Sequence, residues 1–315
     1  MSYLKINTIF VVFLIKSCLI TFIPCISCYI IVIKDRTKRC PLLVLYEIER
    51  LRRDRPYSMT VNHFHDHYEI YYLLSGKRYY FIQDRSYLIQ EGDLVFIDKN
   101  ELHKTRNADV LHHERILLSF DDSWIRSIDE DASTHLLVPF QQKQHIFSLT
   151  GTNRTFVENL LFSLLREQQQ TLGGWQLNSK ALLTQLLIFC SRLTDKISSA
   201  QEHQQAHNPK IFEIVAYINE QYRNRLTLAS ISESFYISPS YFCRSFKETT
   251  GFSFIEYLNN VRIREAQRLL RETKLKVIHI AEQSGFDSVA HFGRVFKQVT
   301  TQTPLECRKL MRHSL

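Results

Sequence analysis

The sequence predicts an α+β protein with two domains. A small β-barrel or jelly roll with a helical hairpin is followed by an all-α domain with two helix-turn-helix units. Three observations predict this order: short β-branched and aromatic runs separated by turn residues within residues 57–120, two amphipathic stretches between residues 151 and 197, and two similar segments 50 residues apart in the C-terminal third. A chain of 315 residues is long enough for about two such cores.

Five strands are expected in a domain that spans residues 43–150. Turn-prone residues such as Ser75-Gly76 and Gly92-Asp93 separate them, and many short strands at this spacing are typical of a barrel or jelly roll. The expected strands cover residues 69–74, 78–82, 86–89, 93–97 and 114–120.

A histidine-rich motif opens this domain. His63-Phe-His65, followed by Glu69 and Gly76, resembles the first motif of cupin domains, and His103 has the spacing of the second motif. Asp98 and Asn100 stand where cupins usually have Pro and Gly. In cupin enzymes the residues that match His63, His65, Glu69 and His103 bind a metal, and imidazole and carboxylate groups suit Fe, Mn, Ni or Zn.

The next segment, residues 151–197, is expected to form a helical pair. Asn153–Gln169 and Asn178–Lys196 have broad apolar faces that can pack on the barrel, and Gly173-Gly174 separates them. Residues 198–209 are polar and lack apolar periodicity, which predicts a linker.

The C-terminal domain, residues 210–312, contains an internal repeat. An offset of 50 residues places Ser234–Lys247 over Ser284–Lys297, and this predicts helix-turn-helix units at residues 228–249 and 276–299. The identical pairs are Ser234/Ser284, Ser238/Ser288, Phe242/Phe292, Arg244/Arg294, Phe246/Phe296, Lys247/Lys297 and Thr250/Thr300.

Each copy is expected to begin with a short helix, turn tightly and continue into a second helix. Gly285 supplies the backbone freedom for the turn of the second copy, and Phe235 is expected at the equivalent place in the first. Ser238, with Pro239 after it, and Ser288 are expected to cap the second helices. The paired Phe residues, four apart, must face the core.

A long helix is expected between the copies. Ser253 and Glu256 form a capping box that opens a helix to about Arg271. Its buried residues are expected to be Ile255, Leu258, Val261, Ala266, Leu269 and Leu270. A stiff helix here would hold the two second helices about 34 Å apart, so that both enter successive major grooves.

The outward faces of the second helices suit DNA. Arg244 and Arg294 can bond guanine edges, and Lys247 and Lys297 can contact phosphates. Residues 211–315 contain 15 Lys and Arg against 10 Asp and Glu, whereas residues 57–210 contain 15 against 18, as in a nucleic-acid-binding domain joined to a sensing domain. The predicted DNA-binding residues are Ser238, Ser240, Tyr241, Cys243, Arg244, Lys247, Ser288, Val289, Ala290, His291, Gly293, Arg294 and Lys297.

These motifs resemble the AraC/XylS family of bacterial transcription regulators. The resemblance implies a homodimer, paired through the helices of residues 151–197, that binds double-stranded promoter DNA with both units and contacts RNA polymerase. It also implies a ligand pocket for an unknown small-molecule effector. Thr301 stands where the family commonly has Gly. The segments that carry the resemblance are Ser238–Lys247, Glu256–Leu258, Arg262–Leu270, Ile280–Phe286, Phe292–Lys297 and Thr303–Glu306, and the implied pocket residues are His63, His65, Glu69, Tyr71 and His103.

Alternatives remain at this point. A metal bound by His63, His65, Glu69 and His103 would make the chain a metal-dependent enzyme with a DNA-binding tail. The resemblance to AraC-type sensing domains implies instead that these residues line a ligand pocket, and we expect no enzyme activity, no metal and no cofactor. The chain also has no nucleophile triad, phosphate loop or nucleotide fingerprint.

The N-terminal 42 residues allow two interpretations. Residues 17–33 are uncharged and apolar, near the lower length limit of a membrane span, and basic residues follow them. They form either an anchor at the inner face of the membrane or an extension outside the working protein. Both interpretations leave the C-terminal domain in the cytoplasm.

Overall fold

The computed structural model describes residues 46–59, 64–126, 128, 135–141, 145–197 and 208–312. The predictions for residues 1–42, and those for the linker as far as residue 207, lie outside the described residues. Asn208 and Pro209, at the end of the predicted linker, are the cap and the first residue of a helix. Within the described ranges, no helix combines the length and the apolar character needed to cross a membrane.

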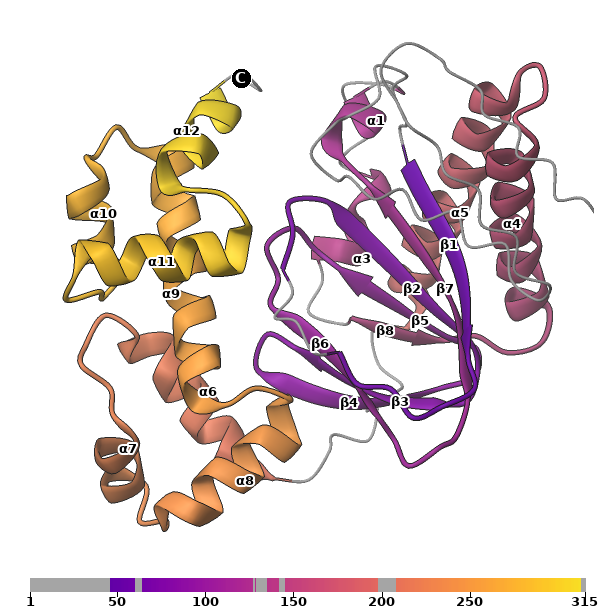
Figure 1. The fold of residues 1–315 in the computed structure, drawn as a ribbon. Helices are drawn as coiled ribbons and strands as arrows, with labels where there is room; N and C mark the ends of the chain where they lie inside the picture. Colours follow the sequence, from indigo (N-terminus) through magenta and orange to yellow (C-terminus); the bar gives the residue numbers. More distant parts are fainter. Residues whose placement is uncertain are drawn as a thin grey trace, which may run out of the picture. The chain divides into compact units, whose positions relative to one another are not determined.

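The described residues of the first domain include eight strands in two antiparallel sheets (Figure 1). One sheet has the order β1 (Tyr46–Arg53), β7 (His113–Phe120), β2 (Tyr68–Ser75), β5 (Asp93–Ile97) and β8 (Ile146–Ser148). The other has the order β4 (Arg85–Gln90), β3 (Lys77–Ile82) and β6 (His103–Asn107). The five predicted strands are present, and β1, β6 and β8 are additional.

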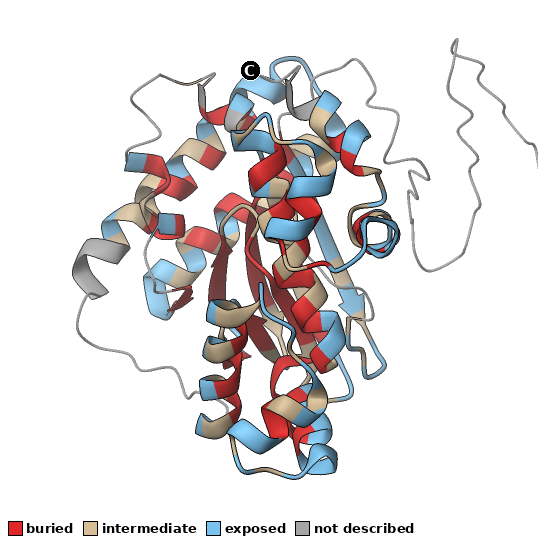
Figure 2. Ribbon diagram, turned by 90° about the vertical axis from the view of Figure 1, so that its left-hand side faces the viewer, coloured by how far each residue is buried: buried red, intermediate tan, exposed pale blue. Residues whose placement is uncertain are grey.

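Strand β2 separates two apolar cores because successive residues of a strand point to opposite faces. Ile70 and Tyr72 belong to the core under the helical pair, whereas Tyr71 and Leu73 belong to the core between the sheets. Buried positions therefore follow one another along β2, and Figure 2 shows that much of the sheet region is buried. Glu69 precedes Tyr71 by two residues and therefore lies on the same face of β2, toward the core between the sheets.

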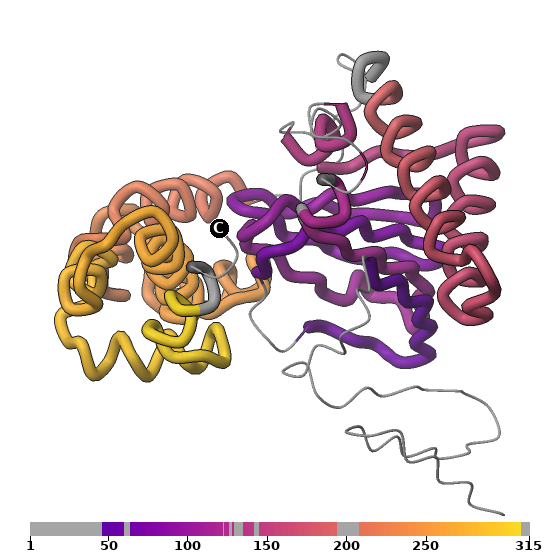
Figure 3. The backbone as a smooth tube through the Cα atoms, turned by 90° about the horizontal axis from the view of Figure 1, so that it is seen from above, coloured from indigo at the N-terminus to yellow at the C-terminus, as the bar shows by residue number. Residues whose placement is uncertain are grey.

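The predicted helical pair is α4 (Gly151–Gln170) and α5 (Trp175–Ile197). The two helices lie side by side against the five-stranded sheet (Figure 3), near the short helices α1 (Asp122–Arg126) and α3 (Val138–Gln141). The side-chain amide of Gln168 accepts from the Ile48 amide at 2.9 Å and donates to the Ile48 carbonyl at 3.0 Å. These two bonds satisfy backbone groups on β1, which is an edge strand.

The C-terminal domain is helical. Its helices are α6 (Pro209–Gln221), α7 (Leu228–Ser234), α8 (Pro239–Thr250), α9 (Phe254–Glu272), α10 (Val277–Gln283), α11 (Val289–Thr300) and α12 (Pro304–Arg312). Ser238 and Ser288 cap α8 and α11, and Ser253 with Glu256 forms the capping box of α9, as predicted. The four Phe residues of α8 and α11 are fully buried: Phe242, Phe246, Phe292 and Phe296.

The prediction that Ile255 is buried is wrong, because its side chain is 57% exposed. The first turn of α9 instead buries Phe254 and Tyr257, followed by Leu258 and Val261. Residues three and four apart share one side of a helix, and Ile255 lies off that side.

The prediction that Phe235 occupies the place of Gly285 in the turn of the first unit is also wrong. Phe235 has φ −105°, and Tyr236 has the positive φ of 53° that corresponds to the φ of 85° at Gly285. The helices α7 and α10 are therefore offset by 49 residues, whereas α8 and α11 are offset by 50. The turn of the second unit is one residue longer, a difference that a single offset could not reveal.

Thr301 is a strained position in the second unit. It ends α11 with a φ of 64°, whereas Gly251 ends α8 with a φ of 80°. A β-branched residue is unfavourable in this left-handed region, so we expect Thr301→Gly to raise the free energy of unfolding by about 1 kcal/mol. Chemical denaturation measures the change, and Thr301→Asn should give a smaller gain. A loss of stability in Thr301→Gly would contradict the assigned backbone conformation.

Candidate nucleic-acid interface and barrel site

The second helix of each unit presents most of its predicted DNA-binding residues to solvent. Within α8 and α11 and their caps, every predicted DNA-binding residue is exposed except Gly293, which is half-buried. On each helix these residues lie on the side away from the buried Phe residues, so each helix has one apolar side and one exposed side. The exposed members are Ser238, Ser240, Tyr241, Cys243, Arg244, Lys247, Ser288, Val289, Ala290, His291, Arg294 and Lys297.

The basic residues on these faces differ from those on α9. Arg268 of α9 binds Glu265 and Glu272 at 2.8 and 2.6 Å. Within the described part of the chain, Arg244 and Arg294 have no carboxylate within 4.0 Å, and the same holds for Lys247 and Lys297. Their charges thus remain accessible to phosphates and base edges.

One exposed position on the same face was missed. Gln298 follows Lys297 and lies four residues after Arg294, on the exposed side of α11. Its counterpart in the first unit is Glu248, an acidic residue that would repel phosphate. The two positions are 50 residues apart, so extending the aligned repeat by one residue beyond Lys247 and Lys297 would have identified them.

Arg262 on α9 connects the two units. Its guanidinium donates to the carbonyls of Tyr222 and Asn224 at 2.8 and 2.9 Å and lies 5.6 Å from the ring of Phe286. Burial lowers the pKa of Arg262, yet an arginine remains charged at neutral pH. Arg262 thereby ties the loop before the first unit and the turn of the second unit to helix α9.

The barrel brings together three of the predicted pocket residues. His65 Nε2 lies 3.1 Å from Glu69 Oε2, and His103 Nε2 lies 3.9 Å from Glu69 Oε1. All three side chains are less than a tenth exposed. Tyr71 is buried nearby, with its ring 5.3 Å from that of Tyr80. His63 lies outside the described residues.

Tyr80 was not predicted as part of this site, although residues 78–82 were predicted to form a strand. Its hydroxyl donates to Glu69 Oε1 at 3.0 Å. Burial, and next the charge of Glu69, raise the pKa of Tyr80 well above its usual value. The phenol therefore keeps its proton and holds the carboxylate in place.

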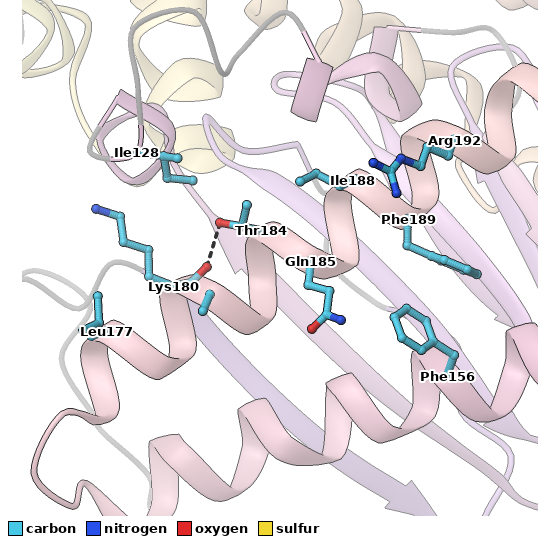
Figure 4. Close-up of a pocket in the computed structure, with 10 residues that line it drawn as sticks. Ile128, Phe156, Leu177, Lys180, Thr184, Gln185, Ile188, Phe189 and Arg192 are labelled. Atoms are coloured by element: carbon cyan, nitrogen blue, oxygen red, sulfur yellow. Dashed lines mark hydrogen bonds between the residues drawn. The ribbon is translucent and has the colours of Figure 1, made fainter.

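A separate hollow lies on the outer side of the helical pair (Figure 4), and none of the barrel residues above lines it. Apolar side chains such as Leu177 and Ile188 alternate there with polar ones such as Lys180 and Arg192. The Thr184 hydroxyl donates to the Lys180 carbonyl at 2.7 Å. The lining residues are Ile128, Phe156, Leu177, Lys180, Ala181, Thr184, Gln185, Ile188, Phe189 and Arg192.

The fold and these exposed helices define a regulator that combines a β-rich ligand domain with two DNA-binding helix-turn-helix units. Residues 45–187 match the AraC-like ligand binding domain, and residues 231–310 match a helix-turn-helix domain. The chain belongs to the AraC/XylS family of transcription regulators.

Among curated relatives, the chain is 34% identical over 143 residues to the uncharacterized HTH-type transcriptional regulator YijO of Escherichia coli (strain K12), covering 44% of the chain and half of the length of YijO. It is 28% identical over 261 residues to YfiF of Bacillus subtilis, covering 81% of each. It is 24% identical to the HTH-type transcriptional activator RhaR of Mannheimia succiniciproducens, covering 83% of the chain and 90% of RhaR.

Two solved structures are also similar. ToxT from Vibrio cholerae matches with 18% identity and a TM-score of 0.35, over 85% of the chain and 98% of ToxT. The C-terminal domain of AraT from Geobacillus stearothermophilus matches with 33% identity and a TM-score of 0.32, over 33% of the chain and 86% of that domain.

Proposed function

We propose that this regulator binds promoter DNA in a sequence-specific manner through the exposed sides of α8 and α11, and responds to a small molecule held in the barrel. The observation that carries the proposal is the pair of similarly capped helices, each with an exposed Arg and Lys that no carboxylate within the described ranges neutralises. In this proposal Arg244 and Arg294 read bases, and Lys247 and Lys297 hold phosphates.

Each predicted segment has its own role in this proposal. Residues 43–150 sense the ligand, residues 151–197 pair two copies, and residues 210–312 bind DNA. The mixed apolar and polar outer side of α5 supports a homodimer, because such surfaces are typical of protein interfaces. RNA polymerase is the proposed partner on the promoter, and the cytoplasm the proposed compartment. The relatives named above are transcription regulators, which supports a role without enzyme activity.

Substitutions on the two exposed faces test this proposal. We expect Arg244→Ala to weaken binding to a duplex selected from a random pool by about 1–3 kcal/mol and to relax base choice at one position. Lys297→Ala should weaken binding to all duplexes and reduce the salt dependence, because one phosphate contact is lost. Fluorescence anisotropy at several salt concentrations measures both effects with the full chain.

Arg268→Ala is the matched control, since Arg268 is a basic residue of the same domain that is engaged with two carboxylates. Its affinity for DNA should remain near that of the unmodified chain. Unchanged affinity and base preference in both Arg244→Ala and Lys297→Ala would show that these faces do not contact DNA.

A further inference from the structure

Two arginine residues lie on the strand faces that enclose the core between the two sheets. Arg78 lies on β3, two residues before Tyr80, and its side chain is 1% exposed. Arg115 lies on β7, two residues before Leu117, and its side chain is 17% exposed. Tyr80 belongs to the core between the sheets and Leu117 packs against it, and residues two apart on a strand share a face. Each sheet thus contributes one cation to a largely buried site, where a charge is costly unless it is paired.

Within the described part of the chain, Arg78 has only neutral hydrogen-bond partners. Nη1 donates to the Tyr57 carbonyl, and Nη2 donates to the Thr105 hydroxyl at 3.1 Å. The Nε atom is buried and donates no hydrogen bond to a described residue, and no described carboxylate lies within 4.0 Å of the guanidinium. A buried guanidinium with an unbonded N–H and no counter-ion is suited to binding an anion.

Arg115 is only partly neutralised. Its Nη2 atom lies 3.5 Å from Glu49 Oε2, and the Glu49 side chain is 53% exposed. An ion pair of this length is weak when water screens the carboxylate. The Nη1 atom of Arg115 is buried and, like Arg78 Nε, donates no hydrogen bond among the described residues. Both guanidinium groups therefore retain an N–H that an anionic ligand could accept from.

Tyr71 lies close to both guanidinium groups. The Arg115 Cζ atom is 5.8 Å from the centre of the Tyr71 ring. Burial raises the pKa of Tyr71, and the charges of Arg78 and Arg115 oppose this rise. Burial also lowers the pKa of Arg78, and the charge of Arg115 lowers it further, although an arginine remains charged at neutral pH. These effects act over short distances, so one ligand could reach both arginines beside this phenol.

The described residues around the two arginines do not offset their charge. His113 is buried two residues before Arg115, and burial, followed by the charges of Arg78 and Arg115, lowers its pKa to about 4. Glu69 is bonded by Tyr80 and lies more than 4.0 Å from both guanidinium groups. Because Glu49 is the carboxylate that pairs with Arg115 and Arg78 has none, a ligand with a single negative charge would balance the site.

We propose that Arg78 and Arg115 bind a small organic carboxylate inside the barrel. Guanidinium groups form strong charge-assisted hydrogen bonds to carboxylates, and their planar N–H arrangement matches the two oxygens. Leu73, which is opposite Arg115 in the β2–β7 pairing, and the ring of Tyr71 offer apolar surface to the body of the ligand. The inference deepens the proposed function by naming the chemical class of the barrel ligand, and only the ligand's effect on DNA binding rests on that function.

The test uses benzoate, which joins one carboxylate to a flat apolar ring, and benzamide, which has a similar shape without the charge. Titration calorimetry of the full chain at low chloride should show one benzoate site per chain, with benzamide binding about tenfold more weakly or less. Arg78→Met and Arg115→Gln should each weaken benzoate binding by about tenfold or more. Arg50→Gln is the matched control, because Arg50 is a basic residue of the same domain that already binds Glu114 at 2.6 Å. Its benzoate affinity should equal that of the unmodified chain.

Chemical denaturation separates a binding role of Arg78 from a structural one. Benzoate should raise the unfolding midpoint of the unmodified chain and leave that of Arg78→Met unchanged, because a ligand stabilises only a folded state that binds it. Circular dichroism shows whether each variant is folded, and Arg115→Gln keeps the test decisive if Arg78→Met does not fold.

The absence of benzoate binding, or equal affinity in both variants and the unmodified chain, would overturn the site. Equal affinity for benzamide would show that charge is not recognised and would also overturn it. Inorganic phosphate that binds more tightly than benzoate, with the same loss in Arg78→Met, would overturn the carboxylate class.

The effect on DNA is measured separately, as the affinity for the selected duplex with and without benzoate. We expect a change of about fivefold or more, and DNA binding that is insensitive to bound benzoate would overturn the carboxylate's role as an effector. DNA binding by a chain that binds no benzoate would overturn the carboxylate site and leave the proposed function intact. Benzoate binding by a chain with no affinity for any duplex would do the reverse.

Discussion

Gly285→Ala is expected to lower the stability of the second helix-turn-helix unit by about 3 kcal/mol. Gly285 has a φ of 85°, and a Cβ atom there would lie 2.7 Å from the Tyr222 carbonyl oxygen and 2.9 Å from the Arg223 Cα. Both contacts are with backbone, so no side-chain rotation relieves them. The left-handed conformation adds about 1–3 kcal/mol of strain for a residue other than Gly.

Hydrogen exchange of the α11 amides measures this loss in the full chain. Gly293→Ala is the matched control, because no atom outside its own helix surroundings lies within 4 Å of a Cβ built there. Ala is favoured over Gly within a helix by about 1 kcal/mol, so this variant should protect α11 slightly more. Equal protection in Gly285→Ala and the unmodified chain would contradict the close approach of the turn to Tyr222.

Phe242→Ala should destabilise the first unit by about 3–5 kcal/mol, the usual cost of removing a fully buried aromatic side chain. Phe242 is 0% exposed, and its ring lies 5.2 Å from that of Phe246 and 5.6 Å from that of Phe254. The cavity would open between α8 and α9, so the cap of α9 should loosen with it.

Hydrogen exchange of α8, together with affinity for the selected duplex, checks this second expectation. Ile255→Ala removes an apolar side chain of the neighbouring helix α9 whose exposed fraction is 57%, and a change within about 0.5 kcal/mol is expected. If the two substitutions had similar effects, the placement of Phe242 on the buried side of α8 and of Ile255 on the exposed side of α9 would be wrong.

Much of the fold could be predicted from the sequence where apolar periodicity is strong. The strands β2 to β5 and β7 have dense apolar runs, and both helix-turn-helix units repeat their Phe, Arg and Lys positions. The strand β6 could not be predicted, since His103-Lys-Thr-Arg-Asn107 has no apolar alternation and is recruited by pairing with β3. The Arg-rich strand β1 is ordered in the same way by β7.

The candidate sites show a similar limit. The resemblance to the cupin motifs grouped His65, Glu69 and His103, but only the backbone carbonyls at His67 and Glu101 determine which ring nitrogens face the carboxylate. The exposed sides of α8 and α11 could be predicted because helical periodicity separates buried Phe from exposed Arg residues. The contact of Arg262 with a loop 38 and 40 residues away depends on tertiary packing, which no local pattern encodes.

The extra residue in the second turn makes the two DNA-binding units unequal. Residues at matching positions of α8 and α11 differ as well, with Pro239 and Cys243 in the first unit and Val289 and Gly293 in the second. Under the proposed function, one chain therefore contacts DNA with two different surfaces in a fixed order, and the sequence that it recognises is not symmetric. Inverting that sequence relative to the gene would place the chain in the opposite orientation with respect to the start of transcription.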